Sequence, residues 1–118
     1  MADQHLDHTV LLGLQEVMED EYPLLLDTFL ADSKERLGSL RLALRAGDAQ
    51  ALRLAAHSFK GSCSNMGAPV LAALCRQLEE IARREQLDEA PPVLERIAAE
   101  FAIVRILLKS ERQRYQFR

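Results

Sequence analysis

Apolar residues recur every three or four positions along most of this chain, which is the spacing that places them on one face of an α-helix. The periodic runs are separated by glycine, proline and aspartate, the residues that most often end or begin helices. The pattern predicts five helices, at about residues 7–18, 20–47, 48–67, 69–84 and 88–112.

Local signals mark the ends of these segments. Gly47 and Gly67 fit left-handed stops at helix C-termini. Asp20, Asp48 and Asp88 stand where a side chain would cap the following helix. Prolines fall in predicted first turns, where a missing N–H does no harm, at Pro23, Pro69, Pro91 and Pro92.

The periodic apolar positions define a candidate core. Short connectors between long amphipathic helices favour antiparallel neighbours. We therefore expect an all-α fold, an antiparallel up-down-up-down four-helix bundle with a short additional N-terminal helix across one end. The chain is expected to form a single domain over 1–118, with the bundle core at about 20–112. The predicted core positions are Leu11, Leu14, Met18; Leu26, Phe29 or Leu30, Ser33, Leu37, Leu40, Leu44; Leu52, Ala55, Phe59, Ser62 or Cys63, Met66; Leu71, Leu74, Leu78, Ile81; and Leu94, Ile97, Phe101, Val104, Leu108.

Composition narrows the function classes. Leu and Ala dominate and β-branched residues are sparse, which favours helices over strands. The net charge is −3 with no basic block, so we expect no nucleic-acid partner. No apolar run approaches the roughly 20 residues of a membrane span, and no signal peptide is evident, so we expect a cytoplasmic protein without a membrane partner.

Cys63 and Cys75 are expected to be reduced and buried. A monomer is the default expectation.

One stripe of polar or small residues runs along the third predicted helix. At about 100° per residue, Lys60 and Gly61 flank the azimuth of His57, and Ser64 falls almost beneath it further along. This stripe differs from the core stripe through Phe59, so we expect it to be partly exposed. A glycine inside a helix costs about 1 kcal/mol relative to alanine. Its presence beside a histidine and a lysine suggests that space is being kept clear.

A phosphoryl carrier would use these residues in a defined way. A neutral imidazole is a competent nucleophile, so His57 could accept the group. The ammonium of Lys60 could hydrogen-bond the dianion. Gly61 would let a partner bring its carboxylate and metal ion close to phosphorus. A plain surface histidine and a packing glycine are equally compatible with the residues taken alone.

A longer motif surrounds this stripe. Ala56-His57-Ser58-Phe59-Lys60-Gly61-Ser62 is followed by Met66-Gly67, Leu71, Leu74-Cys75 and Leu78-Glu79. Over about residues 55–83 this series resembles the signature of histidine-containing phosphotransfer (HPt) domains, and the chain looks like a stand-alone bacterial member of that family. Phe59 and Met66 stand where leucine is commoner in the family, and both keep the positions apolar.

The resemblance implies a helical bundle and a set of roles. His57 would be the phosphoacceptor, modified on Nε2, Lys60 would support the phosphoryl group, and Gly61 would admit the partner. Glu79 lies where the family carries an acidic or amide residue facing the histidine helix, and Arg83 follows one turn later. Ser64 is a further supporting candidate from the helical stripe.

The resemblance also implies a relay rather than an enzyme with its own ATP site. A receiver domain of a hybrid sensor histidine kinase would donate the group from an aspartate, and the receiver of a response regulator would remove it. The Mg²⁺ would belong to the receivers, and this chain would bind no cofactor or metal. The five glycines never form the closely spaced motif of a nucleotide site, which argues against a kinase dimerisation module.

Two further interpretations stay open. The bundle could be a docking module whose histidine is never phosphorylated. The N-terminal group Asp3, His5, Asp7 and His8 could bind a metal ion, although surface polar residues explain it more simply. Glu79-Glu80 is more simply read as helix surface than as a catalytic carboxylate pair.

Overall fold

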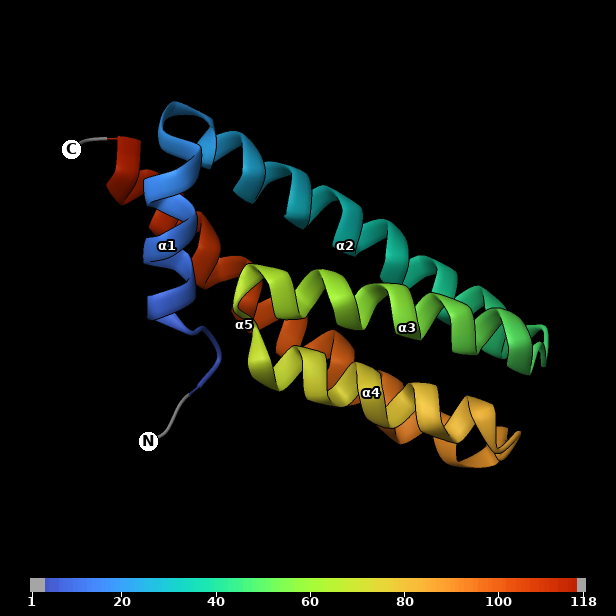
Figure 1. Cartoon of the computed structure of the whole chain (residues 1–118). Helices are drawn as coiled ribbons and strands as arrows, with labels where there is room; N and C mark the ends of the chain where they lie inside the picture. Colours follow the sequence, from blue (N-terminus) through green and yellow to red (C-terminus); the bar gives the residue numbers. More distant parts are fainter. Residues whose placement is uncertain (1–3, 117–118) are drawn as a thin grey trace.

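Helices make up nearly all of the computed structural model, which describes residues 4–116 (Figure 1). No strand occurs in that range. The helices α2 to α5 lie beside one another, with α3 packed on both α2 and α4, and α5 on both α2 and α4. The elements are α1 (His8–Met18), the 3₁₀ turn η1 (Glu19–Glu21), α2 (Tyr22–Arg45), α3 (Ala49–Met66), α4 (Pro69–Arg83), the 3₁₀ turn η2 (Leu87–Glu89) and α5 (Ala90–Gln116).

The predicted apolar stripes form the core. Leu52, Phe59 and Leu78 are fully buried, and most of the predicted positions of α2 and α5 are buried with them. Several predicted positions only pack against the edge of the core, namely Leu14, Met18, Leu44, Ala55 and Leu74. On α3 the fully buried alanine is Ala56 rather than Ala55. The stripe of α3 is therefore rotated slightly from the predicted one, because Ala56 shares a face with Leu52 and Phe59 at spacings of four and three residues.

The two cysteines lie inside the interface of α3 and α4. Cys63 and Cys75 are both free thiols and fully buried, as expected. Contact with Cys75, together with burial, raises the pKa of the Cys63 thiol far above its ordinary value. Cys63 is therefore an apolar packing residue at neutral pH rather than a reactive thiolate.

Most predicted helix ends are confirmed. Gly47 and Gly67 have left-handed φ angles of 66° and 79° at the ends of α2 and α3. Asp48 caps α3, with its carboxylate accepting a hydrogen bond from the Ala51 N–H at 3.0 Å. Pro69 is the first residue of α4.

Two predicted caps are wrong. Asp20 lies within η1 and Asp88 lies within η2, so neither begins an α-helix. The N–H of Tyr22 donates to the Glu19 carbonyl, and the N–H of Ala90 donates to the Leu87 carbonyl. These backbone bonds of the 3₁₀ turns take over donors that a side-chain cap would otherwise satisfy.

The segment before α1 is attached to the bundle. Asp7 caps α1 through its carboxylate, and its own N–H donates to the Gly67 carbonyl at 2.7 Å. Nearby, Nδ1 of His5 lies 2.7 Å from Oε2 of the buried Glu100 on α5. Figure 1 shows α1 at the end of the molecule where α2 begins and α5 ends. None of the helices within the described range is long and apolar enough to cross a membrane.

Candidate functional site

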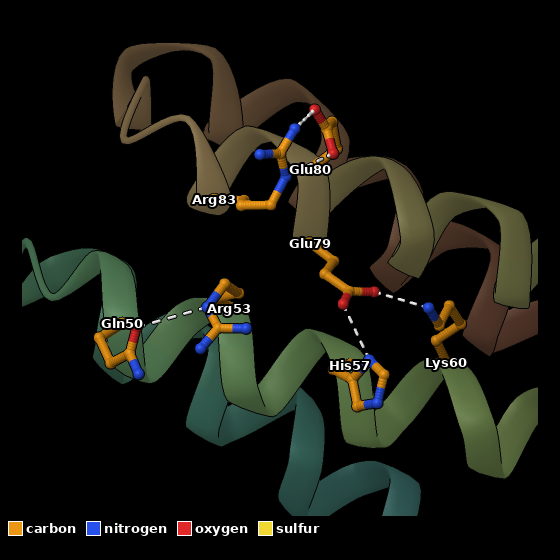
Figure 2. A network of polar contacts seen from close by, with 7 residues as sticks. All are labelled: Gln50, Arg53, His57, Lys60, Glu79, Glu80 and Arg83. Carbon is orange, nitrogen blue, oxygen red and sulfur yellow. Dashed lines mark hydrogen bonds and ion pairs between the residues drawn. The ribbon is translucent and has the colours of Figure 1, made fainter.

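His57 stands on the outward face of α3, with 64 % of its side chain exposed (Figure 2). Its Nδ1 lies 2.8 Å from Oε2 of Glu79 on α4. Within residues 4–116, Nε2 has no hydrogen-bond partner. A proton on Nδ1 satisfies the carboxylate, and this tautomer leaves the lone pair of Nε2 facing solvent. The ring is thus oriented by one nitrogen and available for reaction at the other.

Glu79 holds the site together from the neighbouring helix. Its side chain is only 18 % exposed, and its Oε1 lies 2.8 Å from Nζ of Lys60. Burial raises the pKa of Glu79, but the ammonium of Lys60 and the hydrogen bond with His57 outweigh burial and hold that pKa below its ordinary value. Glu79 is therefore a carboxylate at neutral pH that contacts two residues of α3.

Lys60 lies one turn beyond His57 on the side that faces α4. Its side chain is 28 % exposed, and its ammonium is paired with Glu79 rather than directed at Nε2. The structure thus brings His57 and Lys60 of α3 into contact with one carboxylate, that of Glu79 on α4.

Gly61 lies on the exposed surface of α3 next to this group. A Cβ built on Gly61 would meet no heavy atom within 4 Å. Nothing within residues 4–116 therefore requires a glycine at this position on steric grounds. A steric requirement for the missing side chain would come from a molecule that approaches from outside.

Two predicted supporting residues are not joined to His57. Ser64 is exposed, and its hydroxyl makes no hydrogen bond to the described residues. Arg83 is exposed and donates from Nε to Oε1 of Glu80 at 3.0 Å. Arg83 is the last residue of α4, and this contact turns its side chain back along that helix rather than toward His57.

The N-terminal polar group does not form a metal site within the part of the chain that is described. Asp3 lies outside the described residues. His5 contacts Glu100, and Asp7 is occupied as the cap of α1. No cluster of three or more histidine, cysteine or carboxylate side chains suited to a metal ion occurs between residues 4 and 116.

Two arginines close to His57 were not identified from the sequence. Arg36 of α2 donates to the hydroxyl of Ser58, the residue that follows His57. Arg53 lies one turn before His57, and its Nε donates to Oε1 of Gln50 at 3.3 Å. The spacing of Arg53 from His57 was a usable signal, because residues four apart share a helix face. The contact from Arg36 depends on how α2 packs against α3.

Comparisons with known proteins agree with this geometry. A family model described as the Hpt domain matches residues 24–107. No curated protein sequence matches the chain. The crystal structure of histidine-containing phosphotransfer protein B (HptB) from Pseudomonas aeruginosa PAO1 is 66 % identical over 97 % of this chain and 99 % of its own, with a TM-score of 0.94. The HPT domain of an Hpt sensor hybrid histidine kinase from Shewanella is 19 % identical, with a TM-score of 0.78 over 95 % of this chain and 97 % of its own.

The second likeness concerns the fold alone, whereas the first extends to most of the sequence. The family match covers the helix of His57 and the helix of Glu79 in full. The chain therefore belongs to the histidine-containing phosphotransfer (Hpt) domain family and has a histidine phosphotransfer role in phosphorelays.

Proposed function

We propose that His57 accepts a phosphoryl group on Nε2 from a receiver-domain aspartate of a hybrid sensor kinase and passes it to a response-regulator receiver aspartate. One observation carries the proposal. The exposed imidazole is fixed through Nδ1 by Glu79 at 2.8 Å, while Nε2 is open to solvent. This arrangement presents a nucleophile of defined direction to an incoming domain.

The transfer step balances with these groups. The lone pair of Nε2 attacks phosphorus, the P–O bond to the donor aspartate breaks, and the aspartate leaves as a carboxylate. The imidazole keeps its proton on Nδ1 and gains positive charge, which the carboxylate of Glu79 stabilises. In the onward step a receiver carboxylate attacks phosphorus, the P–N bond breaks, and His57 returns to its neutral form.

Lys60 and Gly61 support this exchange. We infer that the Lys60 ammonium turns from Glu79 to a phosphoryl oxygen once the dianion is in place, because the two anions compete for one cation. Gly61 leaves room for the partner. Neither Ser64 nor Arg83 contacts this group, so no step is assigned to them.

The chain is proposed to act as a phosphocarrier without an ATP site of its own, in the cytoplasm and as a monomer. Mg²⁺ and the acidic cluster that binds it would be supplied by the receiver domain.

We further infer an up-down-up-down order for α2 to α5, with α1 as a short additional helix and one domain over residues 1–118. The short connectors support this order. The pairing of α3 with α4 supports it too. Lys60 contacts Glu79, whereas Arg53, earlier on α3, lines one hollow with Arg83, later on α4.

The decisive experiment follows label from a receiver domain. The wild-type chain and His57→Gln are each mixed with a receiver domain carrying a radioactive aspartyl phosphate. We expect acid-labile label on the wild type and none on His57→Gln, with the same circular dichroism for both. His8→Gln, which changes an exposed histidine on α1, should label normally.

The same experiment separates the alternative functions. With ATP as the sole donor, no label is expected on any of the three proteins. A docking module would bind the receiver without acquiring label. Label on His57→Gln equal to that on the wild type would contradict the assignment of the acceptor.

A further inference from the structure

Arg53 places a guanidinium one turn before His57 on the exposed side of α3. The two residues are four apart, so they share a face of the helix. The Nε of Arg53 donates to Oε1 of Gln50 at 3.3 Å. Figure 2 shows Nε of Arg53 directed at Gln50, with no contact drawn between the guanidinium and the ring of His57. Arg53 therefore lies near the reactive residue without contacting it.

The charge of Arg53 is not compensated within the described part of the chain. Lys60 is paired with Glu79, and Arg83 is paired with Glu80. Arg53 makes one hydrogen bond, to a neutral amide, and no ion pair with any residue between 4 and 116. Its terminal nitrogens remain available as donors to an external acceptor.

A hollow lies next to this guanidinium. Gln50, Arg53 and Arg83 line it, between the turn that joins α2 to α3 and the end of α4. Asp48 and Glu85 also line the hollow, but neither comes within ion-pair distance of Arg53. Asp48 is already occupied as the cap of α3. An acidic side chain that entered here would meet a half-buried, partly oriented guanidinium.

We propose that Arg53 binds a carboxylate on the surface of the incoming receiver domain and so fixes how that domain docks over His57. The proposal rests on the proposed function. A guanidinium matches a carboxylate through two parallel hydrogen bonds, which fix orientation as well as proximity. Nε of Arg53 is engaged by Gln50, and no contact joins the guanidinium to His57. In this proposal Arg53 therefore contacts the partner rather than the phosphoryl group and acts as a specificity-determining residue.

The test measures transfer from one defined donor, an isolated hybrid-kinase receiver domain phosphorylated with acetyl phosphate. Initial rates are recorded against carrier concentration for the wild type, Arg53→Gln, Arg53→Glu and Arg53→Lys. We expect KM to rise about tenfold for Arg53→Gln and further for Arg53→Glu, with kcat changed less than about twofold. Arg53→Lys should recover part of the loss. The difference from the wild type should shrink at about 0.5 M salt.

The matched control is Arg45→Glu. Arg45 is an exposed arginine of α2 that lines a different hollow with Leu94 of α5, so its reversal changes the net charge by the same amount elsewhere. We expect its KM to equal that of the wild type. A KM for Arg53→Glu equal to that of Arg45→Glu would overturn the proposal.

A partner-free arm uses phosphoramidate, which can phosphorylate an exposed imidazole directly. The rate of labelling and the lifetime of the phosphohistidine should be the same in the wild type and in the Arg53 variants. A shorter lifetime in Arg53→Gln would place the guanidinium on the phosphoryl group and overturn the docking role. Failure of the wild type to accept label from either donor would instead contradict the proposed function, so the two failures are distinguishable.

Discussion

At the residue scale, one carboxylate gives the two ring nitrogens of His57 different roles. Glu79 engages Nδ1 at 2.8 Å and so leaves Nε2 as the exposed base. The same carboxylate holds Lys60 at 2.8 Å. The cation is thereby stored beside the nucleophile without blocking it. In the resting site the carboxylate of Glu79 balances the ammonium of Lys60, and a phosphoryl group on His57 would offer that ammonium a second anionic partner.

Gly61 provides the sharpest residue-scale prediction. Gly61→Gln should raise the free energy of unfolding by about 0.5–1 kcal/mol, because glycine is the poorer helix former and the added Cβ meets nothing within 4 Å. Transfer from a phosphorylated receiver should nevertheless slow about tenfold or more, since the side chain occupies the partner's approach. Urea unfolding and initial transfer rates measure the two effects.

Gly38 of α2 supplies the control for this change. It is also an exposed helical glycine whose added Cβ would meet nothing within 4 Å. Gly38→Gln should give a similar gain in stability with unchanged transfer. If both variants transfer at the wild-type rate, steric clearance at Gly61 is not required.

At the scale of elements, Gly67 ends α3 and also receives the segment before α1. Its φ of 79° is left-handed, and an added Cβ would lie 3.0 Å from Cβ of Val10 and 3.2 Å from the Asp7 carbonyl. Gly67→Ala should therefore lower the free energy of unfolding by about 2–3 kcal/mol, from backbone strain plus the clash. Urea unfolding followed by circular dichroism measures the loss.

Gly47 separates these two causes. It has a φ of 66°, but an added Cβ there would meet nothing within 4 Å. Gly47→Ala should cost about 1–2 kcal/mol, the strain alone. Equal losses at Gly47 and Gly67 would show that the contact with α1 adds nothing.

The helix ends show what sequence reasoning reaches. Gly47, Asp48 and Gly67 were predicted because their signals are local: a φ angle that suits glycine or a side chain that caps its own helix. Asp20 and Asp88 failed because backbone bonds within 3₁₀ turns satisfied the same donors. Local sequence signals predicted that a helix begins near each of these residues, but not which groups accept hydrogen bonds from its first N–H groups.

The candidate site shows the same limit. The stripe of His57, Lys60 and Gly61 follows from helical spacing within one segment. The position of Glu79 against it was expected from the family resemblance alone, because apolar periodicity does not set how far α4 slides along α3. The ion pair of Lys60 with Glu79 depends on that register.

At the scale of the whole molecule, the site spans the most extensive helix interface. Phe59, Cys63 and Cys75 fill the interior of that interface, while His57 and Glu79 meet at its outer edge. The rigid interior fixes the distance between the helices. At that distance Glu79 reaches Nδ1 of His57 and orients the imidazole. The packing of α3 against α4 therefore contributes both to the stability of the fold and to the geometry of the site.

The contacts of Glu79 with Lys60 and His57 predict how the stability of the whole molecule depends on pH. The pKa of Glu79 is held below its ordinary value of 4.5 in the folded state, against the effect of burial, by Lys60 and His57. A lowered folded-state pKa contributes stability above about pH 4.5 that is lost as the pH falls through the folded-state value. The free energy of unfolding of Glu79→Gln should therefore be lower than that of the wild type by on the order of 1 kcal/mol near pH 7, and by progressively less below pH 4.5.

Urea unfolding at a series of pH values measures this gap between the variant and the wild type. The control is Glu95→Gln on the exposed face of α5, since Glu95 has no ion pair with any residue between 4 and 116. A gap that stays constant or widens on acidification would mean that the carboxylate of Glu79 does not couple the two helices.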